Sequence, residues 1–189
     1  MFYTEFDHLL PEKYKNVVLL PEDLKPKIEE TNEWTYNDIN NGVYKSGFAT
    51  TAEAYERNVT ALFEALDKAE AHLMSQSSKG PFYFGDVLTE VDVRLYVTLI
   101  RVDPVYVQHF KRNLKDIRSG YPALHRWMRN LYWNVEGFKE TTQFEHIKWH
   151  YTRSHSQINP LGITPLGPVP NILPLEEEVE AAKAAKAAK

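Results

Sequence analysis

Histidines in the last third of the sequence are the first residues whose spacing could support chemistry. His146 and His150 are four residues apart, so a helix would place both on one face, with Glu145 and His155 nearby. Two histidines at this spacing can bind zinc, but the metalloprotease motif has a glutamate directly after the first histidine, where this chain has Ile147. The sequence fixes no third ligand. We therefore expect no metal site, and histidines that are exposed or hydrogen-bonded.

Other catalytic patterns are missing from the sequence. The chain contains no cysteine, so it offers no disulfide, no thiolate ligand and no thiol nucleophile. It also lacks the Gly-x-Ser-x-Gly turn of serine hydrolases and a glycine-rich phosphate loop. We expect no catalytic residue within this chain.

Two tyrosines stand in polar segments where a ligand could reach them. Tyr44 lies in residues 40–49 (NNGVYKSGFA), and Tyr151 lies in residues 150–155 (HYTRSH). A tyrosine in such a place can donate a hydrogen bond to a ligand oxygen while its ring stacks on an aromatic ligand. The alternative is a tyrosine that ties a loop to the core, and spacing alone favours that structural role.

Thr89 and Asp92 have the spacing of a helix start rather than of a catalytic pair. The Thr89 hydroxyl can accept the backbone N–H three residues on, and the Asp92 carboxylate can accept the N–H of Thr89, which makes a capping box with Asp in place of Glu. Leu88 and Val93 match the hydrophobic staple that often accompanies such a box. Both polar residues are therefore predicted to be structural N-cap residues of a buried helix.

Helical spacing dominates the rest of the chain. It predicts helices at 21–39, from a second capping box at 50–53 to about Leu73, at 105–114, from Pro122 to about Leu131, and at 137–151. The glycines and asparagines of residues 40–49 predict an interruption with left-handed or turn conformations. No long stretch alternates with period two, so the predicted fold class is all-α.

The two ends of the chain differ from its middle. Residues 1–20 are apolar without a regular period and are predicted to be an interdomain segment, followed by a helical domain at 21–158. Five prolines between 160 and 174 predict an extended segment, and the Ala/Lys-rich residues after Glu176 have no apolar face. We expect residues 159–189 to be an extended segment and a partly disordered tail.

Composition restricts the location and the partners of the protein. The 189 residues are 43% hydrophobic, and the net charge of −4 gives no basic surface for nucleic acid. The N-terminus lacks the basic and apolar regions of a secretory signal, and no apolar run is long enough to span a bilayer. We expect a cytoplasmic protein that binds neither nucleic acid nor membranes.

Several motifs together resemble one family. They are residues 31–34 (TNEW), 40–49, 84–92 (FGDVLTEVD), 99–106 (LIRVDPVY), 109–111 (HFK), 144–147 (FEHI), 150–155 and 158–163 (INPLGI). The chain from residue 1 to about 168 is similar to the helical C-terminal domain of fungal glutathionyl-hydroquinone reductases, the Xi class of omega-like glutathione transferases.

The resemblance implies a fold, a reaction and a site. It implies a helical bundle preceded, in the family, by a thioredoxin-like domain that carries the catalytic cysteine and the glutathione site. That cysteine attacks the sulfur of a glutathionyl-hydroquinone, and a second glutathione, the co-substrate, regenerates the thiolate. Tyr44 and Tyr151 match the family's two substrate-binding tyrosines, and family members pair as homodimers through their helical domains.

The chain departs from the family at its start. It begins with a methionine where the helical domain begins and has no cysteine, so we expect it to bind no cofactor and to be inactive alone, as a fragment, a truncated gene model or a half-protein. One hypothesis is the substrate-binding and dimerising half of a reductase for glutathionyl-hydroquinones. The other is a non-catalytic module that binds aromatic ligands or a protein partner.

Overall fold

The computed structural model describes residues 5–76, 79–168, 172–174, 176–177, 180, 183–184 and 187. Within these residues the chain forms helices and no strand, apart from an isolated bridge between Phe82 and Gly85. The predicted all-α class is therefore confirmed.

The helices follow one another with short connections. They are the 3-10 turns η1 (Asp7–Leu9) and η2 (Glu12–Tyr14), α1 (Lys25–Trp34), the π-helical segment η3 (Thr35–Asn40), α2 (Gly42–Gly47), α3 (Ala52–Gln76), α4 (Glu90–Leu99), the π-helical segment η4 (Val102–Tyr106), α5 (Val107–His109), α6 (Ile117–Gly120), α7 (Pro122–Asn134), α8 (Phe138–Thr141) and α9 (Phe144–Ser154).

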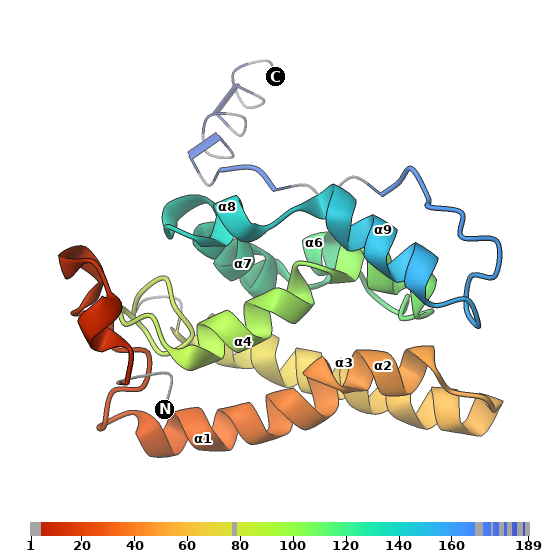
Figure 1. The fold of residues 1–189 in the computed structure, drawn as a ribbon, viewed down its shortest axis with the longest axis horizontal. Coiled ribbons are helices and arrows are strands. Elements are labelled where there is room, and N and C mark those ends of the chain that lie inside the picture. Colours follow the sequence, from red (N-terminus) through yellow and green to blue (C-terminus); the bar gives the residue numbers. More distant parts are fainter. Residues whose placement is uncertain are drawn as a thin grey trace.

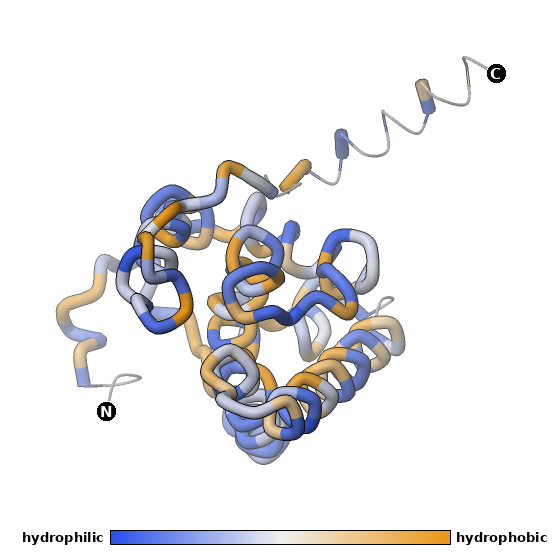
Figure 2. The backbone as a smooth tube through the Cα atoms, turned by 90° about the vertical axis from the view of Figure 1, so that its right-hand side faces the viewer, coloured by the Kyte–Doolittle hydropathy of each residue, from blue (hydrophilic) through white to orange (hydrophobic). Residues whose placement is uncertain are grey.

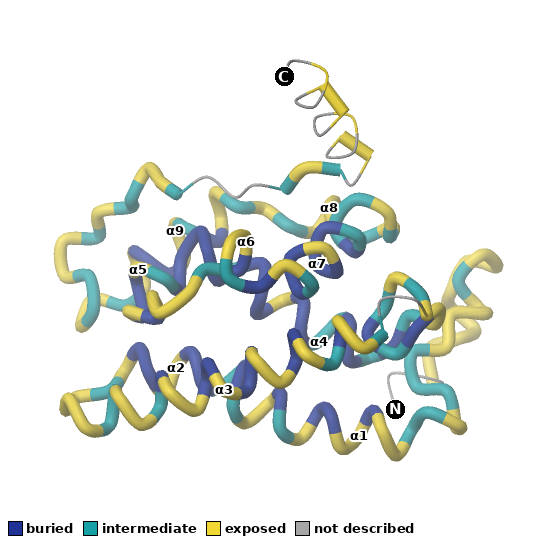
Figure 3. Tube along the Cα trace, turned by 180° about the vertical axis from the view of Figure 1, so that it is seen from behind, coloured by how far each residue is buried: buried dark blue, intermediate teal, exposed yellow. Residues whose placement is uncertain are grey.

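The helices pack in two layers (Figure 1). Helices α1, α2 and α3 form one layer, α6 to α9 form the other, and α4 crosses between them. Helix α3 contacts α2 and α7, and α4 contacts α1, η3 and α7. Helical turns alternate between hydrophobic and hydrophilic residues (Figure 2), and the buried residues gather where the two layers face each other (Figure 3). Each helix thus buries one side, as amphipathic helices do.

The long helix α3 confirms the predicted apolar face. Its buried residues include Val59, Leu62, Phe63, Leu66, Ala69 and Leu73. The helix start differs by one residue from the prediction, because the backbone N–H of Ala54 donates to Oγ1 of Thr51 at 3.2 Å. The capping residue is therefore Thr51 and not Thr50.

The predicted helix at 21–39 is wrong at its start, and its end near residue 39 agrees with the structure although its last part is π-helical. It begins at Lys25 and changes to the π-helical segment η3 at Thr35. The Thr35 hydroxyl donates to the carbonyl of Thr31 at 2.8 Å, and such local bonds from a threonine disturb the regular helix ladder. The N–H of Asn41 then reaches back to the carbonyl of Tyr36, five residues away.

Two later helices also differ from the sequence prediction. The expected helix at 105–114 ends at His109, and Lys111 has a left-handed backbone with φ 54°. The expected helix at 137–151 is two helices, because the Thr142 hydroxyl donates to the carbonyl of Phe138 at 2.7 Å and also contacts the Tyr96 hydroxyl at 2.9 Å. The contact between Thr142 and Tyr96 thus fixes the connection between α8 and α9 against α4.

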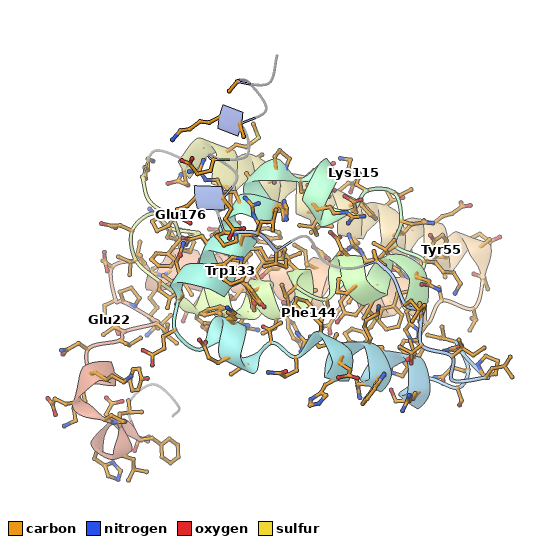
Figure 4. All side chains as sticks on the ribbon, turned by 90° about the horizontal axis from the view of Figure 1, so that it is seen from above. Glu22, Tyr55, Lys115, Trp133, Phe144 and Glu176 are labelled. Atoms are coloured by element: carbon orange, nitrogen blue, oxygen red, sulfur yellow. The ribbon has the colours of Figure 1, made fainter. Side chains whose placement is uncertain are left out.

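The segment after α9 lies along the domain. Residues 162–168 have no regular structure, as the prolines predicted. Lys148 donates to the carbonyl of Leu166 at 2.8 Å, and the indole of Trp133, labelled in Figure 4, donates to the carbonyl of Ile172 at 2.8 Å. The described residues from Glu176 onward are helical, while much of the tail predicted to be disordered lies outside the described residues.

The buried carboxylate of Asp92 joins three parts of the fold. Its Oδ2 accepts the backbone N–H of Thr89 at 2.9 Å and the Thr89 hydroxyl at 3.0 Å, at the start of α4. Its Oδ1 accepts the N–H of Tyr83 at 2.8 Å and the indole N–H of Trp127 at 2.8 Å. Burial raises the pKa of Asp92, and these hydrogen bonds oppose the rise. The residue thus connects the loop at Tyr83, α4 and α7.

We expect Asp92→Ala to lower the free energy of unfolding by about 3 kcal/mol, because it leaves the Tyr83 N–H and the Trp127 indole buried without an acceptor. Chemical denaturation with the Trp fluorescence signal measures the loss. Asp116→Ala is the matched control: Asp116 caps the short helix α6 by accepting from Ser119 at the surface, and its removal should cost about 1 kcal/mol. Equal losses in the two variants would contradict the connecting role of Asp92.

Candidate functional site

Three tyrosine hydroxyls from distant parts of the sequence form a chain of contacts. The hydroxyl of Tyr44, on α2, lies 2.8 Å from that of Tyr151, on α9. The hydroxyl of Tyr106, the last residue of η4, lies 2.7 Å from that of Tyr151. The exposed fractions are 38% for Tyr44, 5% for Tyr151 and 2% for Tyr106, so the chain of hydroxyls runs from the surface into the core. The structure therefore brings together the two tyrosines singled out in the sequence, and adds Tyr106.

Both π-helical segments lead directly to this cluster. Segment η3 ends just before α2, which carries Tyr44, and η4 ends at Tyr106. The N–H of Tyr106 donates to the carbonyl of Arg101, five residues back, at 3.2 Å. π-Helical turns are rare and frequently occur at functional sites, because the extra residue turns the following side chain to a new direction. Pro104 lies within η4.

The ring of Phe110 is the buried floor beneath the tyrosines. It stacks on Tyr106 with centroids 5.2 Å apart and contacts Tyr44 at 5.3 Å and Tyr151 at 5.9 Å. A Cβ atom on Gly47 would lie 2.1 Å from Cδ1 of Phe110. The prediction of left-handed or turn backbone at 40–49 is wrong, because residues 42–47 are helical, and Gly47 is needed instead for the close approach of Phe110.

The hydroxyls of Tyr106 and Tyr151 keep their protons at neutral pH. Burial raises the pKa of Tyr151 to about 12 and raises the pKa of Tyr106 well above its ordinary value. Three hydroxyls bring three protons, and their two mutual contacts use two of them. Because Tyr106 faces the core and Tyr44 is exposed, we expect Tyr106 to donate to Tyr151 and Tyr151 to Tyr44. The Tyr44 proton is then available to an acceptor outside the cluster.

Two histidines that the sequence reasoning did not assign to the site pack beside the cluster. Nε2 of His109 lies 3.0 Å from Nδ1 of His155, and the His155 ring stacks on Phe110 with centroids 5.9 Å apart. Burial, with His155 and Lys111 nearby, lowers the pKa of His109 to about 4, so the imidazole is neutral at pH 7. In the part of the chain that the structure describes, no three His, Cys, Asp or Glu side chains could hold a metal ion, and His146 and His150 are not joined by a third ligand.

Nothing in the sequence alone marked Tyr106, Phe110, His109 or His155 as site residues. Tyr106 and Phe110 look like ordinary apolar core positions, and they are buried as such. Their role depends on the π-helical turn of η4, which no propensity rule predicts. A usable signal is the proline inside a helical pattern at Pro104, because a proline there removes a ladder hydrogen bond and invites irregular geometry.

We expect Gly47→Ala to destabilise the protein by about 2 kcal/mol and to displace Phe110, because the added methyl group has no space. Gly42→Ala on the same helix is the matched control. Its Cβ would meet only Leu62 at 3.4 Å, so it should be neutral or stabilising by up to about 1 kcal/mol. Thermal unfolding measures both. Equal stability of the two variants would show that Phe110 does not depend on Gly47.

The lowered pKa of His109 predicts a loss of stability in weak acid. Between about pH 6.5 and pH 4 the unfolded chain binds a proton at this residue that the folded chain excludes, so the free energy of unfolding falls as the pH falls. Urea unfolding at pH 7.5, 6 and 5 should show that His109→Gln reduces this dependence by on the order of 1 kcal/mol. The exposed His8 offers the control His8→Gln, which should leave the dependence unchanged. If the free energy of unfolding of His109→Gln depended on pH as strongly as that of the wild type, His109 would not be the source of this dependence.

Comparison with known proteins identifies the fold. Residues 52–130 match the family model described as glutathione S-transferase, C-terminal domain. The match begins after Tyr44 and ends before Tyr151, so it includes Tyr106 alone of the three tyrosines. In the described part of the chain, no helix has the length and apolar character needed to cross a membrane.

Curated relatives extend the similarity to most of the chain. The glutathione S-transferase omega-like 2 of Schizosaccharomyces pombe is 57% identical over 173 residues, which cover 91% of this chain and 55% of the relative. The glutathionyl-hydroquinone reductase YqjG of Escherichia coli is 45% identical over 168 residues, which cover 89% of this chain and 48% of the relative. The chain therefore spans about half the length of the curated relatives it matches.

Solved structures agree with these relatives. The glutathione S-transferase Xi of Phanerochaete chrysosporium superposes with a TM-score of 0.86 at 57% identity, covering 93% of this chain and 55% of that one. The Xi glutathione transferase ECM4 of Saccharomyces cerevisiae, in complex with glutathione, gives 0.85 at 54% identity, covering 89% and 54%. The chain thus has the helical fold of the glutathione transferase C-terminal domain, and its relatives include Xi and omega-like glutathione transferases and glutathionyl-hydroquinone reductases.

Proposed function

We propose that this chain is the substrate-binding half of a glutathione-dependent enzyme that reduces glutathionyl-hydroquinones to hydroquinones. The observation that carries the proposal is the chain of hydroxyls from Tyr106 through Tyr151 to the exposed Tyr44. This arrangement offers a proton donor beside aromatic rings, which suits an aromatic ligand with an oxygen substituent. The relatives named as glutathionyl-hydroquinone reductases support the same substrate class.

The chemistry assigns separate roles to the two halves of such an enzyme. A thiolate attacks the glutathionyl sulfur, the bond between that sulfur and the ring carbon breaks, and a mixed disulfide forms. In this proposal the substrate reacts as its keto tautomer, in which the ring carbon that holds sulfur already carries a proton. When the carbon–sulfur bond breaks, its electron pair forms a ring double bond and the carbonyl electrons pass to the attached oxygen, which then takes a proton to complete the hydroquinone. A second glutathione thiolate then attacks the mixed disulfide, which releases oxidised glutathione. This chain has no cysteine, so in this proposal the thiolate comes from outside it.

In this proposal the tyrosines stabilise the hydroquinone as it leaves the sulfur. Tyr44 donates a hydrogen bond to the ring oxygen, and this bond becomes stronger as negative charge develops there. Tyr151, whose pKa burial raises to about 12, stays protonated and donates to Tyr44, so that Tyr44 keeps its own proton directed at the substrate. Tyr106 acts through Tyr151 as a positioning residue. Hydrogen bonds in a row polarise one another, so the bonds from Tyr106 and Tyr151 strengthen the one that Tyr44 donates.

Two further parts of the proposal rest on the family resemblance alone. They are a homodimer formed through the helical domain and a location in the cytoplasm. Sedimentation of the purified chain at micromolar concentration tests the first, and a monomer at all concentrations would contradict it.

A chimera tests the proposed reaction. This chain would replace the helical half of the Xi glutathione transferase ECM4 of Saccharomyces cerevisiae, to which it is 54% identical. We expect reduction of glutathionyl-hydroquinone, a kcat lower by about 100-fold in Tyr44→Phe and in Tyr151→Phe, and a loss of about tenfold in Tyr106→Phe. Tyr36→Phe is the matched control, because Tyr36 is exposed and lies outside the cluster.

Two outcomes would contradict the assignment. Unchanged kcat in both Tyr44→Phe and Tyr151→Phe would remove the tyrosines from the site. A chimera that folds and binds glutathione but shows no activity would favour the alternative, a non-catalytic module for aromatic ligands or a protein partner. Intact mass spectrometry of the native protein separates the two: a mass greater by about one small domain supports the enzyme, and 22.0 kDa supports the module.

A further inference from the structure

A cavity lies next to the tyrosine cluster but is separate from it. It has a volume of about 170 Å³ and is bordered by η4, α5, α9 and the segment at 158–165. None of the three clustered tyrosines lines it, although their sequence neighbours Val105 and Thr152 do. His109, which contacts His155, forms part of its wall. The cavity is therefore a distinct space on the other side of the same chain segments.

The cavity is positively charged. Lys111 and Lys148 line it, and no aspartate or glutamate does. Lys148 donates to the carbonyls of Leu166 and Gly167, so its ammonium group is partly held by the chain. Lys111 is exposed to solvent where it lines the cavity, so its ammonium group is accessible to a ligand there. An accessible cation at a concave site favours an anion.

The backbone of Lys111 is held in an unusual conformation. Its φ of 54° is left-handed, which is uncommon for any residue other than glycine, asparagine or aspartate. The hydroxyl of Tyr55, labelled in Figure 4, donates to the Lys111 carbonyl and helps to fix this turn. Such strain persists only where surrounding contacts impose it, and it concentrates at functional sites. The strained turn is what places a lysine on the cavity wall.

The remaining walls include apolar and polar side chains. Val105, Ile158 and Ile163 supply aliphatic surface, while the Gln108 side chain and Asn159 add polar groups. The cavity is smaller than the pockets that hold drug-sized ligands, which have about 300–1,000 Å³. We propose that this cavity binds a small aromatic monocarboxylate, with the carboxylate at Lys111 and the ring between Val105 and the isoleucines. The inference does not depend on the proposed reaction.

Calorimetric titration of the 189-residue chain with benzoate tests the proposal. We expect saturable binding of one benzoate per chain, and binding of the neutral isostere benzamide at least about tenfold weaker, because the charge-assisted bond to Lys111 is lost. Lys111→Asn should weaken benzoate binding at least about tenfold. Asparagine tolerates the left-handed backbone, so the fold is kept while the charge is removed.

Control variants separate this cavity from other sites. Lys25→Asn removes an exposed lysine on α1 and should leave the benzoate affinity unchanged. Tyr44→Phe should also leave it unchanged, since Tyr44 does not line the cavity. Three results would each overturn the proposal: no benzoate binding, binding that is the same in Lys111→Asn, or binding that is lost in Tyr44→Phe. Inorganic phosphate that binds as tightly as benzoate would likewise overturn it, because the site would then recognise charge without the ring.

Discussion

The buried carboxylate of Asp92 is the constraint on which the placement of the other helices depends. It accepts hydrogen bonds from Thr89, from the loop at Tyr83 and from Trp127 on α7. A second buried carboxylate, Asp103 in η4, accepts the backbone N–H groups of Ile117 at 2.7 Å and Arg118 at 3.1 Å. Burial raises the pKa of both acids, and in both the hydrogen bonds oppose that rise. The stretch from α4 to η4 is thus fixed near each end.

Because α4 is held in place, the π-helical segment η4 that follows it places Tyr106 in a defined position. The π-helical geometry of η4 turns Tyr106 toward Tyr151. The π-helical segment η3 likewise precedes α2, which carries Tyr44. Each π turn gives up regular helix bonding, which surrounding contacts must offset. Because Gly47 has no side chain, the Phe110 ring can pack against α2 beneath the tyrosines. The site is therefore made from local departures from helix geometry that a rigid frame supports.

The sequence predicted the regular parts of this fold and missed the irregular ones. The α3 face from Val59 to Leu73 and the N-cap of α4 at Thr89 follow from periodicity and capping, which are local properties of the chain. The π turns and the break at Thr142 depend on contacts with distant residues such as Tyr96, and no local rule contains them. For the same reason Tyr44 could be singled out by its polar setting, whereas Tyr106, buried among apolar residues, could not.

The tyrosine cluster and the charged cavity share the same walls. Tyr151 and Thr152 are consecutive on α9, and Val105 and Tyr106 are consecutive in η4; in each pair one residue belongs to the cluster and the other lines the cavity. Consecutive residues of a helix point about 100° apart, so one helix can present different side chains to two neighbouring spaces. Helix α9 and segment η4 therefore each contribute one residue to the tyrosine cluster and the next residue to the cavity wall.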